Sequence, residues 1–201
     1  MSKERQSRKI ENKLKAELAA KKNKKINRLI GLGMTFAIVG LIGGAAVFSA
    51  KSKSLSGVKT FSKLTAEHVK EPAKYSKNPP VGGDHSSIVL NCGIYDQSVP
   101  NENVIHSLEH GATWITYDPE KITGEALMSL RSQVPLTYGV ISPYPGLSSP
   151  IMVSAWGKQL SVSKIDDPKL ATFIKKYTNS PSAPEPGAPC TGGLNAPGRI
   201  G

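Results

Sequence analysis

The sequence predicts an α+β protein, with an N-terminal transmembrane helix followed by one small extracytoplasmic domain that holds a mixed sheet and short helices. Three observations predict this class. Residues 29–50 are an uncharged apolar run, long enough as a helix to span the roughly 30 Å hydrocarbon core of a bilayer. Later segments alternate between apolar and polar residues, as strands do, or repeat apolar residues every three to four positions, as helices do. Their irregular order favours an α+β sandwich.

The positive charge is concentrated before the apolar run. Of the formal net charge of +11, residues 1–28 carry +8, from eleven Lys and Arg against three Glu, and the remaining fifteen basic and twelve acidic residues leave +3. A nearly neutral domain argues against a nucleic-acid partner. Basic residues are retained on the cytoplasmic side, so we predict a single-pass protein of the cell membrane with a cytoplasmic tail at residues 1–28. Residues 51–63 are polar and are predicted to be a tether.

The apolar run also has the composition of a cleaved signal peptide, but two features favour an uncleaved anchor. Its basic and apolar regions are both too long, and Phe48 interrupts the small-residue pattern that cleavage after Ala50 would need. Gly40 and Gly44 form a G-x-x-x-G motif on the same helix. This motif leaves a homodimer through the transmembrane helix open.

The elements of the domain, predicted to cover residues 64–179, follow from local patterns. A helical turn at 64–71 precedes a turn-rich stretch of Pro and Gly, and a brief strand is predicted at 88–90. Asn101 is a suitable N-cap for a helix at 102–110, with Gly111 just beyond its end. Further strands are predicted at 112–117, 138–142 and 151–160, and helices at 125–133 and 168–177. Residues 180–201 are rich in Pro and Gly and are predicted to be a flexible tail fixed at most at Cys190.

Three of the chain's four histidines fall within one short stretch. His106 and His110 are one helical turn apart, on one face of the predicted helix, so both can present a ring nitrogen to one ion. His85 follows a Pro-Pro-Val-Gly-Gly-Asp turn that fixes its approach, and completes a three-histidine site. The fourth ligand is water, Cys92 or Met152: a sulfur ligand favours copper, and an open position favours zinc. His68 is expected to be exposed and outside the site.

Side chains around this predicted site have supporting roles. Glu109 and Asp84 are candidates to accept a hydrogen bond from the second imidazole nitrogen of a ligand. Cys92 and Cys190 both lie on the predicted outer side, where a disulfide between them would persist. The alternative is a thiolate ligand at Cys92 and a free Cys190.

The same histidines admit two other functions. The stretch His106 to His110 matches H-x-x-E-H, a zinc peptidase pattern in which the Glu, here Glu109, activates water. Such an enzyme needs a further acidic ligand on a second helix, and the candidate, Glu185, lies between prolines in the predicted loose tail. A structural or interaction domain of the cell envelope, with the histidines as buried scaffolding, is the third interpretation. Metal binding for sensing, storage or delivery is favoured over turnover.

Several motifs in the same order resemble a known family. They are Tyr75, Pro79-Pro80-x-Gly82-Gly83-x-His85, Cys92-Gly93-x-Tyr95, His106-Ser107-Leu108-Glu109-His110-Gly111, Tyr117 and Ala155-Trp156-Gly157. Together they resemble the bacterial family catalogued as domain of unknown function 3105, over about residues 64–190. The resemblance implies a single-pass membrane protein with an extracytoplasmic domain, and motif histidines at His85, His106 and His110. It implies no activity. Residues 88–90 stand where the family often has an aromatic residue.

Overall fold

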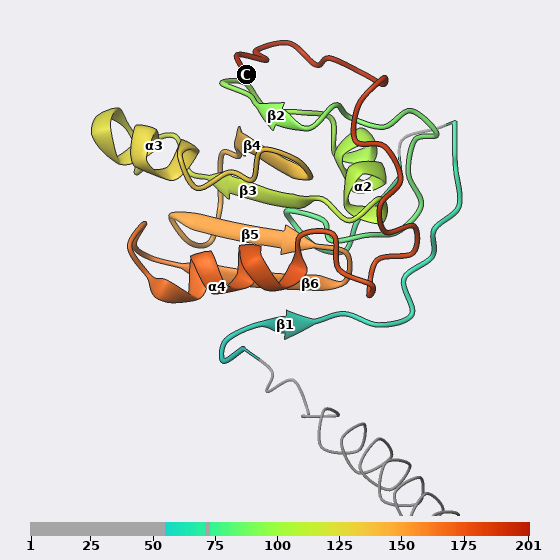
Figure 1. The fold of residues 1–201 in the computed structure, drawn as a ribbon, viewed down its shortest axis with the longest axis horizontal. Helices are drawn as coiled ribbons and strands as arrows, with labels where there is room; N and C mark the ends of the chain where they lie inside the picture. Colours follow the sequence, from blue (N-terminus) through green and yellow to red (C-terminus); the bar gives the residue numbers. More distant parts are fainter. Residues whose placement is uncertain (1–54, 71–72) are drawn as a thin grey trace, which may run out of the picture. The chain divides into compact units, whose positions relative to one another are not determined.

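The computed structural model of the protein describes residues 55–70 and 73–201. The strands in these residues form one mixed sheet in the order β1-β6-β5-β3-β4-β2 (Figure 1). The strands are β1 (Lys59–Thr60), β2 (Gly93–Ile94), β3 (Thr113–Tyr117), β4 (Gly139–Pro143), β5 (Ile151–Ala155) and β6 (Lys158–Val162), and the helices are α2 (Asn101–Glu109), α3 (Gly124–Arg131) and α4 (Pro168–Tyr177). A mixed sheet with short helices confirms the predicted α+β class.

The predicted membrane helix at 29–50 and the basic tail at 1–28 lie outside the described residues. Among residues 55–70 and 73–201, no helix has both the length and the apolar character needed to cross a membrane. Within 51–63, which we predicted to be a tether, β1 pairs antiparallel with β6. The sheet therefore begins earlier in the chain than residue 64.

β3 lies at the centre of the sheet and separates two apolar clusters. It runs parallel to β4 and antiparallel to β5, with Trp114 opposite Val140 and Ile115 opposite Ile141 on β4. Because side chains alternate across a strand, neighbouring residues of β3 face opposite sides. Trp114 and Val140 pack in a cluster with residues of α2, whereas Ile115 and Ile141 pack with residues of α3 and α4. Both faces of β3 are thus covered, which explains why all five of its residues are buried.

The helices begin and end close to where the sequence predicts. α4 has the predicted bounds, because Pro168 opens it and the Asp167 carboxylate accepts a hydrogen bond from the Lys169 N–H at 2.9 Å. α2 differs at its start, where Asn101 is the first helical residue and Pro100 precedes it without a side-chain cap. Gly111 follows α2 with φ of 99°. It confirms the expected glycine beyond the helix end.

The strand predicted at 151–160 is instead a hairpin. β5 and β6 pair antiparallel, with Ala155 opposite Lys158, so the chain reverses at Trp156 and Gly157. Gly157 has φ of 65°, a left-handed conformation that glycine adopts without steric cost. The prediction was wrong because the alternation of Val153, Ala155 and Gly157 with polar neighbours runs into the turn, and the change of parity to Leu160 and Val162 comes only after it.

Two predicted elements before α2 are absent from the described residues. No helical turn forms at residues 64–70, because the backbone there bonds to His85: its N–H donates to the Glu67 carbonyl (2.9 Å), and its carbonyl accepts from the Val69 N–H (2.8 Å). Residues 88–90 do not form a strand of the sheet either. Leu90 makes only an isolated bridge with Leu194.

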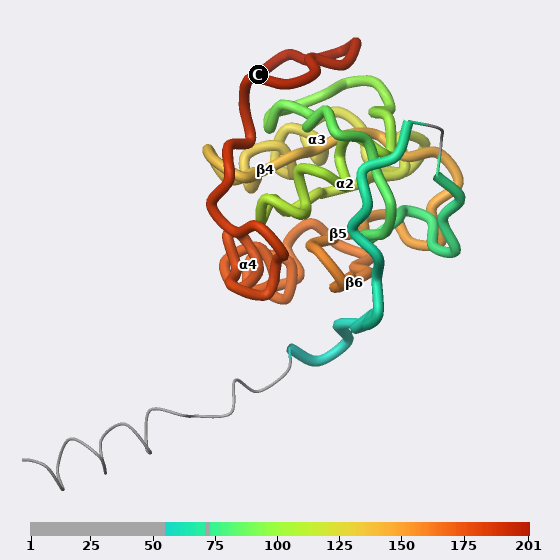
Figure 2. Tube along the Cα trace, turned by 90° about the vertical axis from the view of Figure 1, so that its right-hand side faces the viewer, coloured from blue at the N-terminus to red at the C-terminus, as the bar shows by residue number. Residues whose placement is uncertain are grey.

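The segment 180–201, predicted to be a flexible tail, is bound to the domain along much of its length. Figure 2 shows it running from α4 along one side of the domain to the C-terminus. The Asn91 N–H donates to the Leu194 carbonyl (2.9 Å), and the Ile94 N–H donates to the Gly201 carbonyl (2.8 Å). Ala196 is buried. The tail needs no core of its own, because its backbone forms hydrogen bonds with residues 89–96.

Candidate metal centre

α2 presents three polar side chains on one face. His106, Glu109 and His110 are three and four residues apart, so they project from the same side of the helix. All three are buried, although each is polar. The opposite side of the helix packs Val104 and Leu108 into an apolar cluster under the sheet. This packing holds the polar face in a fixed orientation.

His85 is delivered by the turn that precedes it. The turn contains Gly82 and Gly83, both at positive φ, and the Tyr75 hydroxyl donates to the Asp84 carbonyl at 2.8 Å. The His85 side chain is fully buried, and its Nε2 lies 2.9 Å from Glu109 Oε2. The turn thus brings His85 against α2. We predicted Glu109 as an acceptor for the second nitrogen of a ligand imidazole, but Glu109 faces Nε2 of His85, and Nδ1 lies against the Gly83 carbonyl.

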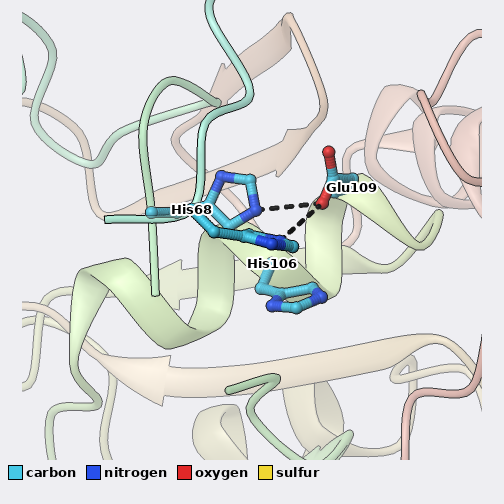
Figure 3. Close-up of side chains that lie close together, drawn as sticks. His68, His106 and Glu109 are labelled. Atoms are coloured by element: carbon cyan, nitrogen blue, oxygen red, sulfur yellow. Dashed lines mark hydrogen bonds and ion pairs between the residues drawn. The ribbon is translucent and has the colours of Figure 1, made fainter. Parts of the chain in front are cut away.

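His68 also belongs to the site, contrary to our prediction. Its backbone forms a parallel bridge with His85, which places its ring 4.8 Å from the His106 ring in a stacked arrangement. Its Nε2 lies 3.7 Å from Glu109 Oε2, and 47% of its side chain is exposed. Figure 3 shows His68 and His106 beside the Glu109 carboxylate. No local pattern could have identified His68, because only the backbone pairing across seventeen residues brings it there.

Three of the imidazoles are oriented by backbone carbonyls. The Nδ1 atoms of His85, His106 and His110 lie 2.8, 2.8 and 2.7 Å from the carbonyl oxygens of Gly83, Ser86 and Pro189. A carbonyl oxygen only accepts, so each Nδ1 carries the hydrogen and donates it. The lone pair of each neutral ring is therefore on Nε2, inside the cluster. This is the arrangement that metal-binding histidines adopt, because the second nitrogen is fixed by a backbone or carboxylate acceptor.

This orientation places two hydrogen-bond acceptor atoms next to each other at two points in the cluster. His85 Nε2 faces Glu109 Oε2 at 2.9 Å, and His106 Nε2 faces His110 Nε2 at 3.0 Å. If the imidazoles are neutral and the carboxylate is ionised, neither contact is a hydrogen bond, because both atoms of each pair offer only lone pairs. Each contact needs a positive charge, which a proton or a metal ion can supply.

His106 is poorly suited to hold that charge as a proton. Burial lowers the pKa of its imidazole, and the neighbouring imidazoles of His110, His85 and His68 lower it further, against the opposing effect of the Ser86 carbonyl. The neutral form is therefore favoured. A neutral imidazole is the form that binds a metal ion.

The tail supplies further groups at the C-terminal end of α2. The Glu185 N–H donates to the Glu109 carbonyl at 3.0 Å, and the Gly187 N–H donates to the His110 carbonyl at 3.2 Å. These bonds place Glu185 Oε2 3.6 Å from His110 Nε2. We placed Glu185 in a loose segment and discounted it, so its position beside His110 is a correction.

The remaining sequence candidates lie elsewhere. Cys92 and Cys190 form a disulfide, with their Cα atoms 5.4 Å apart, so Cys92 offers no thiolate. The sulfur of Met152, on β5, lies 3.9 Å from the Ser148 hydroxyl. Asp84 Oδ1 accepts from the Glu67 N–H at 3.3 Å.

Within residues 55–70 and 73–201, two sets of side chains bring their ligand atoms within 4.8 Å of one another. The first set is His68, His85, His106 and Glu109, and the second is Glu109, His110 and Glu185. The predicted trio is thereby divided: His85 and His106 lie in one set, and His110 lies in the other. Glu109 is common to both.

Comparison with known proteins gives one match. The family model described as "Protein of unknown function (DUF3105)" matches residues 68–192, a range that begins at His68 and includes every side chain of both sets. No curated protein and no solved structure matches the chain.

Proposed function

The chain belongs to the DUF3105 family of proteins of unknown function. We propose that its domain binds a transition metal ion, zinc or copper, through His68, His85, His106 and Glu109. The observation that carries this proposal is the convergence of these four side chains with the lone pairs of His85 and His106 turned inward. Burial of so many polar acceptors without a cation would be costly.

The ligand types favour a divalent ion. Three imidazoles and one carboxylate suit Zn²⁺, which is usually four-coordinate, and they suit Cu²⁺ as well. Copper(I) prefers sulfur ligands, and both cysteines of the chain are in the disulfide. Zinc is therefore our first choice, with copper(II) as the competing ion.

The exposure of the ligands supports reversible binding. His85, His106 and Glu109 are buried, whereas the side chain of His68 is 47% exposed. Three ligands are thus held in place and the fourth is at the surface, where an ion can enter or leave. We propose sensing, storage or delivery of the ion on this basis.

The domain is proposed to act outside the cytoplasm, anchored by residues 29–50. The supporting observations are the apolar run, the basic segment before it and a disulfide of the kind that persists in oxidising compartments. Immunoblotting of cell fractions checks this: the full-length chain is expected with the membranes, and a shortened, released form would contradict an uncleaved anchor.

Metal analysis of the untagged full chain in detergent tests the binding site. The wild type should retain zinc or copper after desalting, and His68→Gln should lower the affinity by at least about tenfold. Lys70→Gln is the matched control, since Lys70 is also exposed and lies two residues away. His106→Gln should weaken binding further. If the wild type holds no ion more tightly than His106→Gln, the histidines are structural and the proposal fails.

Hydrolysis by the H-x-x-E-H pattern is the second candidate, because Glu185 places an acidic group beside His110, although from the tail and not from a second helix. A groove of about 660 Å³ lies nearby, lined by Tyr75, Val69 and Asp84 among others. Glu109→Gln separates the two functions. A ligand role predicts lower metal affinity, whereas a role as general base predicts normal metal content and loss of turnover on ester or peptide substrates.

A further inference from the structure

We infer that the cluster holds two divalent cations, the first at the site proposed above and a second between His110, Glu185 and Glu109, with the Glu109 carboxylate bridging them. This inference rests on the proposed function, since it adds a second ion beside the first. The second position has the ligand types of a zinc site, one imidazole and two carboxylates, with ligand atoms within 4.8 Å of one another.

The second position is built by the fold. His110 is buried, and its Nδ1 donates to the Pro189 carbonyl at 2.7 Å, which leaves the Nε2 lone pair free for an ion. Glu185 Oε2 lies 3.6 Å from that nitrogen. The Glu185 N–H is bonded to the carbonyl of Glu109 itself. One backbone hydrogen bond therefore couples the tail carboxylate to the proposed bridging residue.

The two contacts between acceptors indicate the number of cations. His85 faces Glu109 at 2.9 Å within the first set, and His106 faces His110 at 3.0 Å where the two sets meet. One ion at the first position satisfies the lone pairs of His85, Glu109 and His106, but His110 belongs to the other set. His110 therefore needs a cation of its own, and the second set supplies the ligands for a metal ion in that place.

Glu109 can join the two ions because a carboxylate has two oxygen atoms. His68 and His85 both approach the same oxygen, Oε2. In Figure 3 the dashed contacts to Glu109 end on one of its oxygens while the other points away. Two ions bridged in this way in proteins lie about 3.5–4 Å apart. At that separation the second ion lies beside the first, on the side of the tail.

Metal stoichiometry of the untagged full chain in detergent tests this inference. All four histidines of the chain belong to the cluster, so no other imidazole site competes. The wild type should bind two Zn²⁺ ions. Glu185→Gln should bind one, with the second ion weakened at least about tenfold and the first unchanged. Glu120→Gln is the control, because Glu120 is also exposed and belongs to neither set, and it should bind two.

Electron paramagnetic resonance of the Cu²⁺-loaded protein tests whether the ions are neighbours. Two bridged Cu²⁺ ions should show spin coupling, and Glu185→Gln should show the spectrum of an isolated ion. One ion in the wild type, an unchanged pair of ions in Glu185→Gln, or two uncoupled ions would each overturn the inference and leave the proposed function standing. Absence of binding in the wild type removes the proposed function as well.

Discussion

At the scale of single residues, the positions of three hydrogen atoms determine what the cluster can bind. Carbonyl oxygens of Gly83, Ser86 and Pro189 each accept from an Nδ1 atom, so the Nε2 atoms are acceptors that face other acceptors. In the metal-free protein a proton is the other cation that can occupy these contacts. Proton and metal binding therefore compete at the same nitrogens.

The lowered pKa of His106 predicts how the stability of the metal-free protein depends on pH. Burial lowers the pKa of His106 in the folded chain, while in the unfolded chain it is about 6.5. Above that value both states are neutral. As the pH falls below about 6.5, the unfolded state takes up a proton more readily, so the free energy of unfolding decreases.

Denaturant unfolding between pH 8 and pH 5, followed by the fluorescence of Trp114 and Trp156, measures this effect. His106→Gln does not titrate, and its stability should fall less over the same range. Equal pH dependence in the two proteins would show that His106 is not the group responsible.

At the scale of elements, the turn before His85 illustrates how loop geometry positions a ligand. Gly82 has φ of 145°, and a Cβ there would lie 2.8 Å from Leu64 and 3.2 Å from the Trp156 ring. The site thus depends on a glycine that allows Leu64 and Trp156 to approach the backbone. Because His85 follows three residues later, a shift of the turn moves a ligand.

Gly82→Ala should therefore reduce both stability and metal affinity. We expect a loss of roughly 2–4 kcal/mol in the free energy of unfolding, from the clash together with backbone strain. Gly146→Ala is a matched control, because Gly146 has φ of 78° with no atom within 4 Å of its would-be Cβ. It should lose only roughly 1–2 kcal/mol and bind zinc normally. Equal metal affinity in the two variants would contradict the role of the turn.

The elements that the sequence predicts correctly are those with local signals. α4 has an apolar stripe, a capping Asp167 and a Pro168 at its first position, and these fix its bounds. The strands β3 and β4 and the helix α3 are also predicted, with ends shifted by one or two residues. The hairpin of β5 and β6 is not, because alternation continues into the turn and the core-facing positions change parity only after it, at Leu160 and Val162.

The candidate site is predicted only in part, for the same reason. Helical spacing identifies His106, Glu109 and His110, and the turn identifies His85. His68 and Glu185 reach the cluster through backbone pairing with distant segments, His68 with His85 and Glu185 with Glu109. Such pairing depends on the tertiary fold, and residue spacing does not encode it.

At the scale of the whole molecule, the disulfide connects the tail to the sheet. Cys92 and Cys190 are 98 residues apart in sequence, and the Cys92 N–H donates to the Cys190 carbonyl at 2.8 Å. Pro189, whose carbonyl orients His110, immediately precedes Cys190. The disulfide therefore helps to hold Pro189, and through it His110, at the proposed second metal position. The ligands of the proposed first position all lie outside the tail.

Replacing both cysteines, as Cys92→Ser with Cys190→Ser, should lower the free energy of unfolding by about 2–5 kcal/mol, because a long loop is no longer closed in the unfolded chain. On the two-ion assignment, zinc binding at the second position should weaken more than at the first. Isothermal titration of the double variant and of chemically reduced wild type checks both expectations. An equal loss at the two positions would show that the disulfide acts only on global stability.

The location of Glu185 and Pro189 so late in the chain has a consequence for biogenesis. A nascent protein that has not yet released residues 185–190 from the ribosome or translocation channel possesses the imidazoles but lacks the second carboxylate and the carbonyl that orients His110. On the two-ion inference, such a chain can hold the first ion, but the second position forms only once residues 185–190 have folded onto α2.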